Sequence, residues 1–251
     1  MTSWKISMIK LLVLLLLLIP FISFAQDKTP SSEYGFETGV DLRALKKIRR
    51  YILVAESKNR NELGDSDYHQ ALIGSYYRLT KRFRMGAFMQ VEQGLRLDED
   101  WVKGAKWEWQ DINSRWDYSS VLDATYTDQF AGNFLWELKS RLYYYHSREA
   151  LQLRLRPGIR YFILKFGRPE WQFFTEIEAY IPFNYGENWL YEYWVYAGSL
   201  YQVTPKLALG PVISFRERWF HAYDAFEKKS GQSFKSNFES TYLGLNLLYN
   251  F

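Results

Sequence analysis

The chain has 251 residues, with 32 basic and 28 acidic side chains, and it contains no cysteine. Disulfides, thiolate metal sites and cysteine nucleophiles are therefore excluded, and the near-balanced charge gives no argument for nucleic-acid binding. Aromatic residues make up 19% of the chain, a share typical of sheets and of water–lipid boundaries rather than of helical bundles.

The first 25 residues have the pattern of a secretory signal peptide. Lys5 and Lys10 precede a leucine-rich run over 11–19, and Ser23-Phe24-Ala25 supplies the small residues of a cleavage site. We expect cleavage after Ala25, which leaves 26–33 as a short N-terminal segment and 30 basic against 28 acidic residues, a net charge of +2. The absence of cysteine at the cleavage point excludes a lipid-anchored N-terminus.

Alternation of apolar and polar side chains recurs along almost all of 34–251 and predicts β-strands. The alternation is clean in six stretches, which are 83–96, 116–126, 134–145, 151–161, 171–181 and 243–251. It is irregular in five others, which are 34–43, 50–60, 67–79, 189–203 and 206–217. The count is eleven, whereas bacterial single-chain barrels have even numbers, so we expect ten to twelve strands. The stretch 41–56 is ambiguous, because its apolar residues also suit one face of a helix.

The connections alternate between short ones, at 46–49, 80–82, 127–129 and 203–206, and longer ones, at 61–66, 97–115, 183–188 and 219–236. Short turns at one end and long loops at the other predict an all-β, antiparallel up-and-down barrel over 34–251. After Ala25 no apolar run approaches the length of a membrane helix. Two classes remain, which are a secreted soluble barrel and a transmembrane barrel of the outer membrane.

Three features favour the outer-membrane class. Many strands are long enough to cross a bilayer obliquely, and the polar face of the strands is densely charged with alternating signs. Aromatic residues stand near the ends of the apolar faces, as in the girdles of membrane barrels. The predicted girdle comprises Trp116, Tyr126, Tyr161, Trp171 and Tyr249.

The stretch "LQLRLRPGIRY" at 151–161 is the most marked case of a charged face, with Arg154, Arg156 and Arg160 on alternate positions. If this strand pairs with 171–181, these arginines meet Glu176 and Glu178, so an internal charge ladder is favoured over an anion-binding row. A local bulge is expected at Pro157, which donates no ladder hydrogen bond. The full set predicted to line the lumen is Arg84, Glu92, Arg96, Asp117, Asp123, Glu137, Lys139, Arg141, Arg154, Arg156, Arg160, Glu176 and Glu178.

The chain ends on Phe251, which closes an alternating strand. This resembles the terminal strand of bacterial outer-membrane barrels, whose last aromatic residue is read during assembly. We therefore expect two partners, the lipid of the outer membrane of a Gram-negative bacterium and the barrel-assembly machinery.

The order of the segments also resembles a family of uncharacterised outer-membrane barrels of Gram-negative bacteria, a domain-of-unknown-function family. The resemblance is carried by "VDLRALKKIRRYILVAESKNR", "ALIGSYYRLTKRFRMGAFMQVEQGLR", "LQLRLRPGIRY", "YEYWVYAGSLYQVTPKLALGPVISFRER" and "YLGLNLLYNF", which span about 36–251. It implies a fold and a location, and it carries no substrate or active site.

The residues predict no catalytic centre, no metal site and no cofactor. The histidines are His69, His146 and His221, and His146 stands beside Ser147, so the two side chains of a strand would face opposite sides. Three functions remain open: a structural or interaction barrel with at most a narrow pore, a channel for small solutes through a charged lumen, and a lipid-modifying enzyme.

Overall fold

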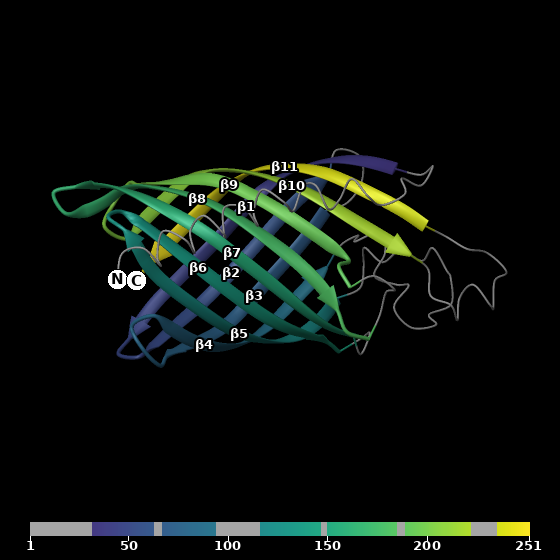
Figure 1. Ribbon diagram of the computed structural model, residues 1–251, viewed down its shortest axis with the longest axis horizontal. Helices are drawn as coiled ribbons and strands as arrows, with labels where there is room; N and C mark the ends of the chain where they lie inside the picture. Colours follow the sequence, from purple (N-terminus) through teal and green to yellow (C-terminus); the bar gives the residue numbers. More distant parts are fainter. Residues whose placement is uncertain (1–31, 63–66, 94–115, 147–149, 185–188, 222–234) are drawn as a thin grey trace, which may run out of the picture.

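The computed structural model describes residues 32–62, 67–93, 116–146, 150–184, 189–221 and 235–251. These residues form an all-β closed barrel of eleven strands (Figure 1). The strands are β1 (Ser32–Ile48), β2 (Tyr51–Glu62), β3 (Asp67–Arg78), β4 (Phe83–Gln93), β5 (Trp116–Ala131), β6 (Phe134–Tyr145), β7 (Ala150–Lys165), β8 (Arg168–Pro182), β9 (Glu192–Gln202), β10 (Leu207–His221) and β11 (Lys235–Asn250). In this part of the chain, no helix is long and apolar enough to cross a membrane.

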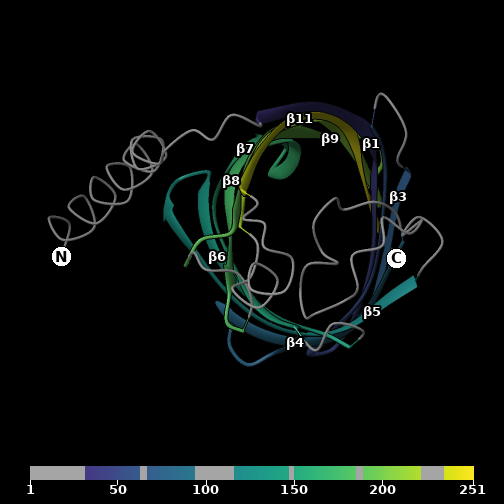
Figure 2. The same cartoon turned by 90° about the vertical axis from the view of Figure 1, so that its right-hand side faces the viewer.

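Each strand pairs antiparallel with its neighbour in sequence, and the barrel closes through a parallel seam between β1 and β11 (Figure 2). The seam runs from the pair Ser32–Asn237 to the pair Leu45–Asn250. The all-β barrel is confirmed, and eleven strands fall within the predicted ten to twelve. An odd number is possible because β1 and β11 run in the same direction.

The ambiguous stretch 41–56 is a hairpin, so its alternative interpretation as a helix is wrong. β1 continues to Ile48, a turn follows at Arg49-Arg50, and β2 begins at Tyr51. Arg49 takes a left-handed φ of 53° at this turn. β1 pairs with β11 on one side and with β2 on the other, and this pairing satisfies the backbone hydrogen-bonding groups of β1. β1 is therefore a strand even though its leucines have the spacing of a helix.

The short turns gather at one end of the barrel (Figure 1). The turn that we expected at 127–129 lies later, at Gly132-Asn133, because Gly132 provides the left-handed φ of 48° that a tight hairpin needs. A register shift between Gln129 and Ala131 accompanies the longer strand. A further two-residue turn at Phe166-Gly167 joins β7 to β8.

The bulge expected at Pro157 is not observed. The pairs Leu155–Ala179 and Gly158–Glu176 belong to the same register, so the β7–β8 ladder passes Pro157 without a shift. The irregularity lies at Ile163 and Leu164, nearer the turn. The predicted signal peptide and Arg96 lie outside the described residues.

Candidate functional site

The barrel is apolar outside and polar inside. Large apolar side chains are exposed on the outer face, and Ile73 in the middle of β3 exposes 67% of its surface. Many charged side chains are buried, including Arg141, Glu176 and Arg218. The interior also holds two clusters of aromatic and aliphatic side chains, one around Tyr76 and Phe88 and one around Trp194 and Tyr242. The lumen is therefore a packed, charged interior.

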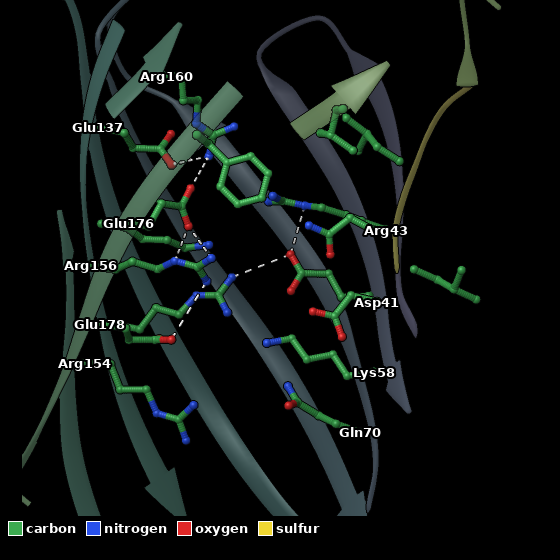
Figure 3. A pocket seen from close by; sticks show the side chains of 18 of the residues that line it. Asp41, Arg43, Lys58, Gln70, Glu137, Arg154, Arg156, Arg160, Glu176 and Glu178 are labelled. Carbon is green, nitrogen blue, oxygen red and sulfur yellow. Dashed lines mark hydrogen bonds and ion pairs between the residues drawn. The ribbon is translucent and has the colours of Figure 1, made fainter. Parts of the chain in front are cut away.

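Within the lumen lies a cavity of about 140 Å³ (Figure 3). Seven basic residues line it, namely Arg43, Lys58, Lys139, Arg141, Arg154, Arg156 and Arg160. Five acidic residues line it as well, namely Asp41, Glu56, Glu137, Glu176 and Glu178. Two cationic charges are therefore in excess. We take this cavity as the candidate functional site.

A ladder of ion pairs along β6, β7 and β8 forms one wall. Glu176 accepts a hydrogen bond of 2.5 Å from Nε of Arg156 and one of 3.0 Å from Nη2 of Arg160. The same Nη2 of Arg160 lies 3.0 Å from Glu137, and Glu137 also pairs with Arg84 at 3.1 Å. Charges of both signs thus alternate along the wall and satisfy one another.

Gly158 makes this arrangement possible. It stands opposite Glu176 in the ladder, and a Cβ built on it would meet Cγ of Glu176 at 2.7 Å. A side chain there would push the carboxylate off its two arginines.

A second network joins β6 to β1, β2 and β5. Asp123 accepts a hydrogen bond of 2.7 Å from Nε of Arg141 and lies 3.5 Å from Nζ of Lys139. Glu56 lies 3.0 Å from Nε of Arg43 and 3.8 Å from Nη2 of Arg141. Arg141 therefore links two carboxylates on β5 and β2, strands that are separated by β3 and β4.

Arg154 occupies an aromatic slot. Its guanidinium carbon lies 3.8 Å from the ring centre of Tyr143 and 4.4 Å from that of Tyr180, and it donates hydrogen bonds to Gln152, at 2.8 Å, and to the hydroxyl of Tyr145. Of the three arginines of the 151–161 stretch, Arg156 and Arg160 contact Glu176, and Arg156 also approaches Glu178 at 3.9 Å.

The two remaining predicted acids lie near the long-loop end, where Glu92 on β4 stands opposite Asp117 on β5. Both are buried. Glu92 accepts hydrogen bonds from Tyr68, at 2.9 Å, and from Gln90, at 2.8 Å. Asp117 accepts one of 2.8 Å from the amide of Tyr118.

A third network, at the same end of the barrel, was missed from the sequence. Glu192 pairs with Arg218 at 2.6 Å and with Arg216 at 3.3 Å, and Glu37 lies 3.4 Å from Arg216 and 3.7 Å from Arg60. These residues lie on β1, β2, β9 and β10, where the alternation is irregular. Their inward position could be predicted only by continuing the two-residue alternation of apolar and polar side chains through these strands.

The predicted girdle residues lie among other aromatic side chains. Trp171 packs on Tyr201 with ring centres 4.8 Å apart, and Tyr126 packs on Trp136 at 5.2 Å. In the same way Tyr161 meets Phe134 at 4.7 Å, and Tyr249 meets Phe251 at 4.6 Å. All of these pairs lie near the short-turn end, whereas Trp116 begins β5 at the other end and is exposed.

Two of the three histidines make side-chain contacts on exposed parts of the barrel. Nδ1 of His69 lies 2.9 Å from Oδ1 of Asn59, and Nε2 of His146 lies 2.9 Å from Oγ of Ser120 on β5. The serine that contacts His146 is thus Ser120 on the neighbouring strand β5 and not the adjacent Ser147. This contact cannot be recognised from neighbours in the sequence. The ring of His221 is outside the described side chains, and the described residues contain no cluster of His, Asp and Glu that could hold a metal ion.

Comparison with known proteins adds no family, since neither the protein-family models nor the curated proteins contain a match to this sequence. The resemblance to uncharacterised outer-membrane barrels therefore remains a prediction that rests on the strand motifs.

Proposed function

We propose that the chain is an integral β-barrel of the outer membrane of a Gram-negative bacterium, exported by its signal peptide and inserted by the barrel-assembly machinery. The observation that carries the proposal is the inverted polarity of the barrel. A closed barrel leaves no unpaired strand edge, and its exposed apolar face is what lipid requires. In water the same face, with side chains such as Ile73 and Leu122 exposed, would be a large aggregation-prone patch.

The height of the apolar band supports this proposal. On the outer face of β7, apolar residues recur from Leu151 to Tyr161. Ten residue steps of about 3.3 Å, tilted by roughly 40°, give a band about 25 Å high, which is the height typical of membrane barrels.

The packed interior favours a structural or interaction barrel with at most a narrow pore. The cavity of about 140 Å³ has the bulk-liquid volume of between four and five waters, at about 30 Å³ each. On its long-loop side, the ion pairs of Glu37 and Glu192 with Arg216 join β1, β9 and β10. General diffusion of the kind seen in barrels of 16 to 18 strands is therefore not expected.

Fractionation of cells that produce the protein tests the location. We expect it in the outer-membrane fraction, with faster migration on a gel when unheated than when boiled. Recovery as a soluble periplasmic protein would refute the proposal. In planar bilayers we expect small or no conductance, and large open-channel steps would favour the solute channel instead.

A second candidate function, an ester hydrolase of the outer leaflet, is favoured by the contact between Ser120 and His146. The pair lies close to Tyr118 and Tyr144, two exposed aromatic residues at the long-loop end, and such residues mark the depth of the lipid headgroups. With its proton on Nδ1, His146 accepts the Ser120 hydroxyl proton, as a base does for a serine nucleophile. Attack on a lipid ester would give an acyl-serine and release the alcohol, and water would then release the acid.

Labelling with a fluorophosphonate probe tests this second candidate. Labelling of the wild-type protein that is lost in Ser120→Ala and kept in Ser75→Ala would support it. The second candidate would be eliminated if the wild-type protein did not react with the probe. It would also be eliminated if the Ser120→Ala variant were labelled as strongly as the wild type.

A further inference from the structure

A row of four polar residues crosses four adjacent strands at the level of the cavity. Asp41 on β1 stands opposite Lys58 on β2 and opposite Asn246 on β11, and Lys58 stands opposite Gln70 on β3. All four line the cavity. We call Asn246, Asp41, Lys58 and Gln70 the polar row.

In the polar row, most side chains make no hydrogen bond to the described residues of the protein, although Asp41 has Lys58 and Arg60 as electrostatic neighbours. Oδ1 of Asp41 is buried and accepts no hydrogen bond. Within the described residues, no hydrogen bond or ion pair engages the side chains of Asp41, Lys58 or Asn246. Glu56, Glu137, Glu176 and Glu178, the other carboxylates of the cavity, all contact arginines.

A buried polar atom without a hydrogen bond is costly, and Oδ1 of Asp41 is such an atom. Asp41 and Lys58 face the same small cavity, and Arg154 and Arg156 lie on its far side (Figure 3). The lining carries seven cations and five carboxylates. A ligand of this cavity therefore needs an anionic group for the excess positive charge and a hydrogen-bond donor for Asp41.

We propose that the polar row binds a small carboxylic acid whose neighbouring carbon carries a hydroxyl or ammonium group, that is, an α-hydroxy or α-amino acid. The carboxylate lies between Lys58 and the arginines of β7, and the hydroxyl or ammonium group donates to Asp41, with Asn246 beside it. A cavity of about 140 Å³ compares with one of about 150 Å³ that holds benzene. The ligand is thus limited to about six heavy atoms.

This inference deepens the proposed function by giving the narrow lumen a ligand, but binding does not depend on passage across a membrane. A barrel that fractionates as a soluble protein and still binds the acid would refute the location alone. An outer-membrane barrel without binding would refute the ligand alone.

Titration calorimetry of the purified, folded protein with glycolate and with acetate tests the ligand class. The two probes share the carboxylate, and only glycolate has the hydroxyl. We expect glycolate to bind about tenfold more tightly, the factor expected for a hydrogen bond to a charged group. Equal affinity for the two, or no saturable binding of glycolate, would overturn the proposal.

Two variants locate the binding. Asp41→Asn should bring glycolate down to the affinity of acetate, and Lys58→Met should weaken both about tenfold. Lys165→Met, at an exposed site of the β7–β8 turn, is the matched control and should change neither. Unheated migration on a gel shows that each variant is folded. Unchanged glycolate binding in folded Asp41→Asn and Lys58→Met would refute the site, and the comparison of the two acids on wild-type protein stands even if a variant fails to fold.

Discussion

Replacing Glu176 with glutamine is expected to destabilise the barrel substantially. The carboxylate is buried and holds two arginines, Arg156 at 2.5 Å and Arg160 at 3.0 Å. A hydrogen bond to a charged group contributes about 1.5–3 kcal/mol, so losing the charge from both sets an upper limit near 6 kcal/mol. Two facts reduce it: the arginine side chains are 26% and 24% exposed, and each keeps a second carboxylate. We expect a loss of about 2–3 kcal/mol.

Urea unfolding of the purified protein in detergent micelles, followed by tryptophan fluorescence, measures this change. The control is Glu170→Gln on the same strand, which breaks the exposed pair of Glu170 with Lys165 and should cost less than about 0.5 kcal/mol. The double variant Arg160→Gln with Glu176→Gln should cost less than the sum of the single variants, since the two residues contact each other.

Three results would refute this reasoning. One is a Glu176→Gln protein that unfolds at the urea concentration of the wild type. Another is a Glu170→Gln protein that loses as much stability as Glu176→Gln. The third is strict additivity in the double variant, because it would mean that Arg160 and Glu176 do not act through their contact.

Other substitutions test further parts of the barrel. Gly158→Ala should cost about 1–3 kcal/mol in the same unfolding assay, because its Cβ meets Glu176, and an unchanged midpoint would show that the carboxylate has room to move. Phe166→Asn should stabilise the barrel by up to about 1 kcal/mol, because Phe166 is 96% exposed with a φ of 51° and asparagine tolerates that conformation better. Ile73→Lys should cost about 2–4 kcal/mol when unfolding is measured in lipid vesicles, whereas a lysine without effect there would place Ile73 in water.

The strands could be predicted from the sequence because each of them obeys one local rule. Apolar side chains at every second residue reveal a strand wherever one face is apolar. This pattern located β4 to β8 closely. The strand number could not be settled in the same way, because it depends on pairing between β1 and β11, which are about 200 residues apart. Only closure of the barrel decides that 41–56 is a hairpin.

The part of the candidate site that depends on local pattern and on pairing of neighbouring strands could be predicted from the sequence. The ladder of Glu176 joins neighbouring strands, so it follows from the register of a single hairpin. Arg141 on β6 reaches Glu56 on β2, and Arg60 lies over the ring of Trp194 at 4.7 Å. Such contacts depend on the curvature of the barrel, which no local pattern encodes. The polar row also depends on it, since β11 meets β1 only at the seam.

The buried charges have a second role at the parallel seam, where they fix the register. Parallel pairing is slightly weaker than antiparallel pairing, and β1 begins at the end of the barrel that carries the long loops (Figure 1). Glu37 on β1 accepts a hydrogen bond of 3.1 Å from Ser240 on β11 and pairs with Arg216 on β10 and with Arg60 on β2. A slip of β1 by one residue would turn Glu37 to the outer face and leave two buried arginines without it. One carboxylate thus holds four strands in register at the point where an eleven-stranded barrel has to close.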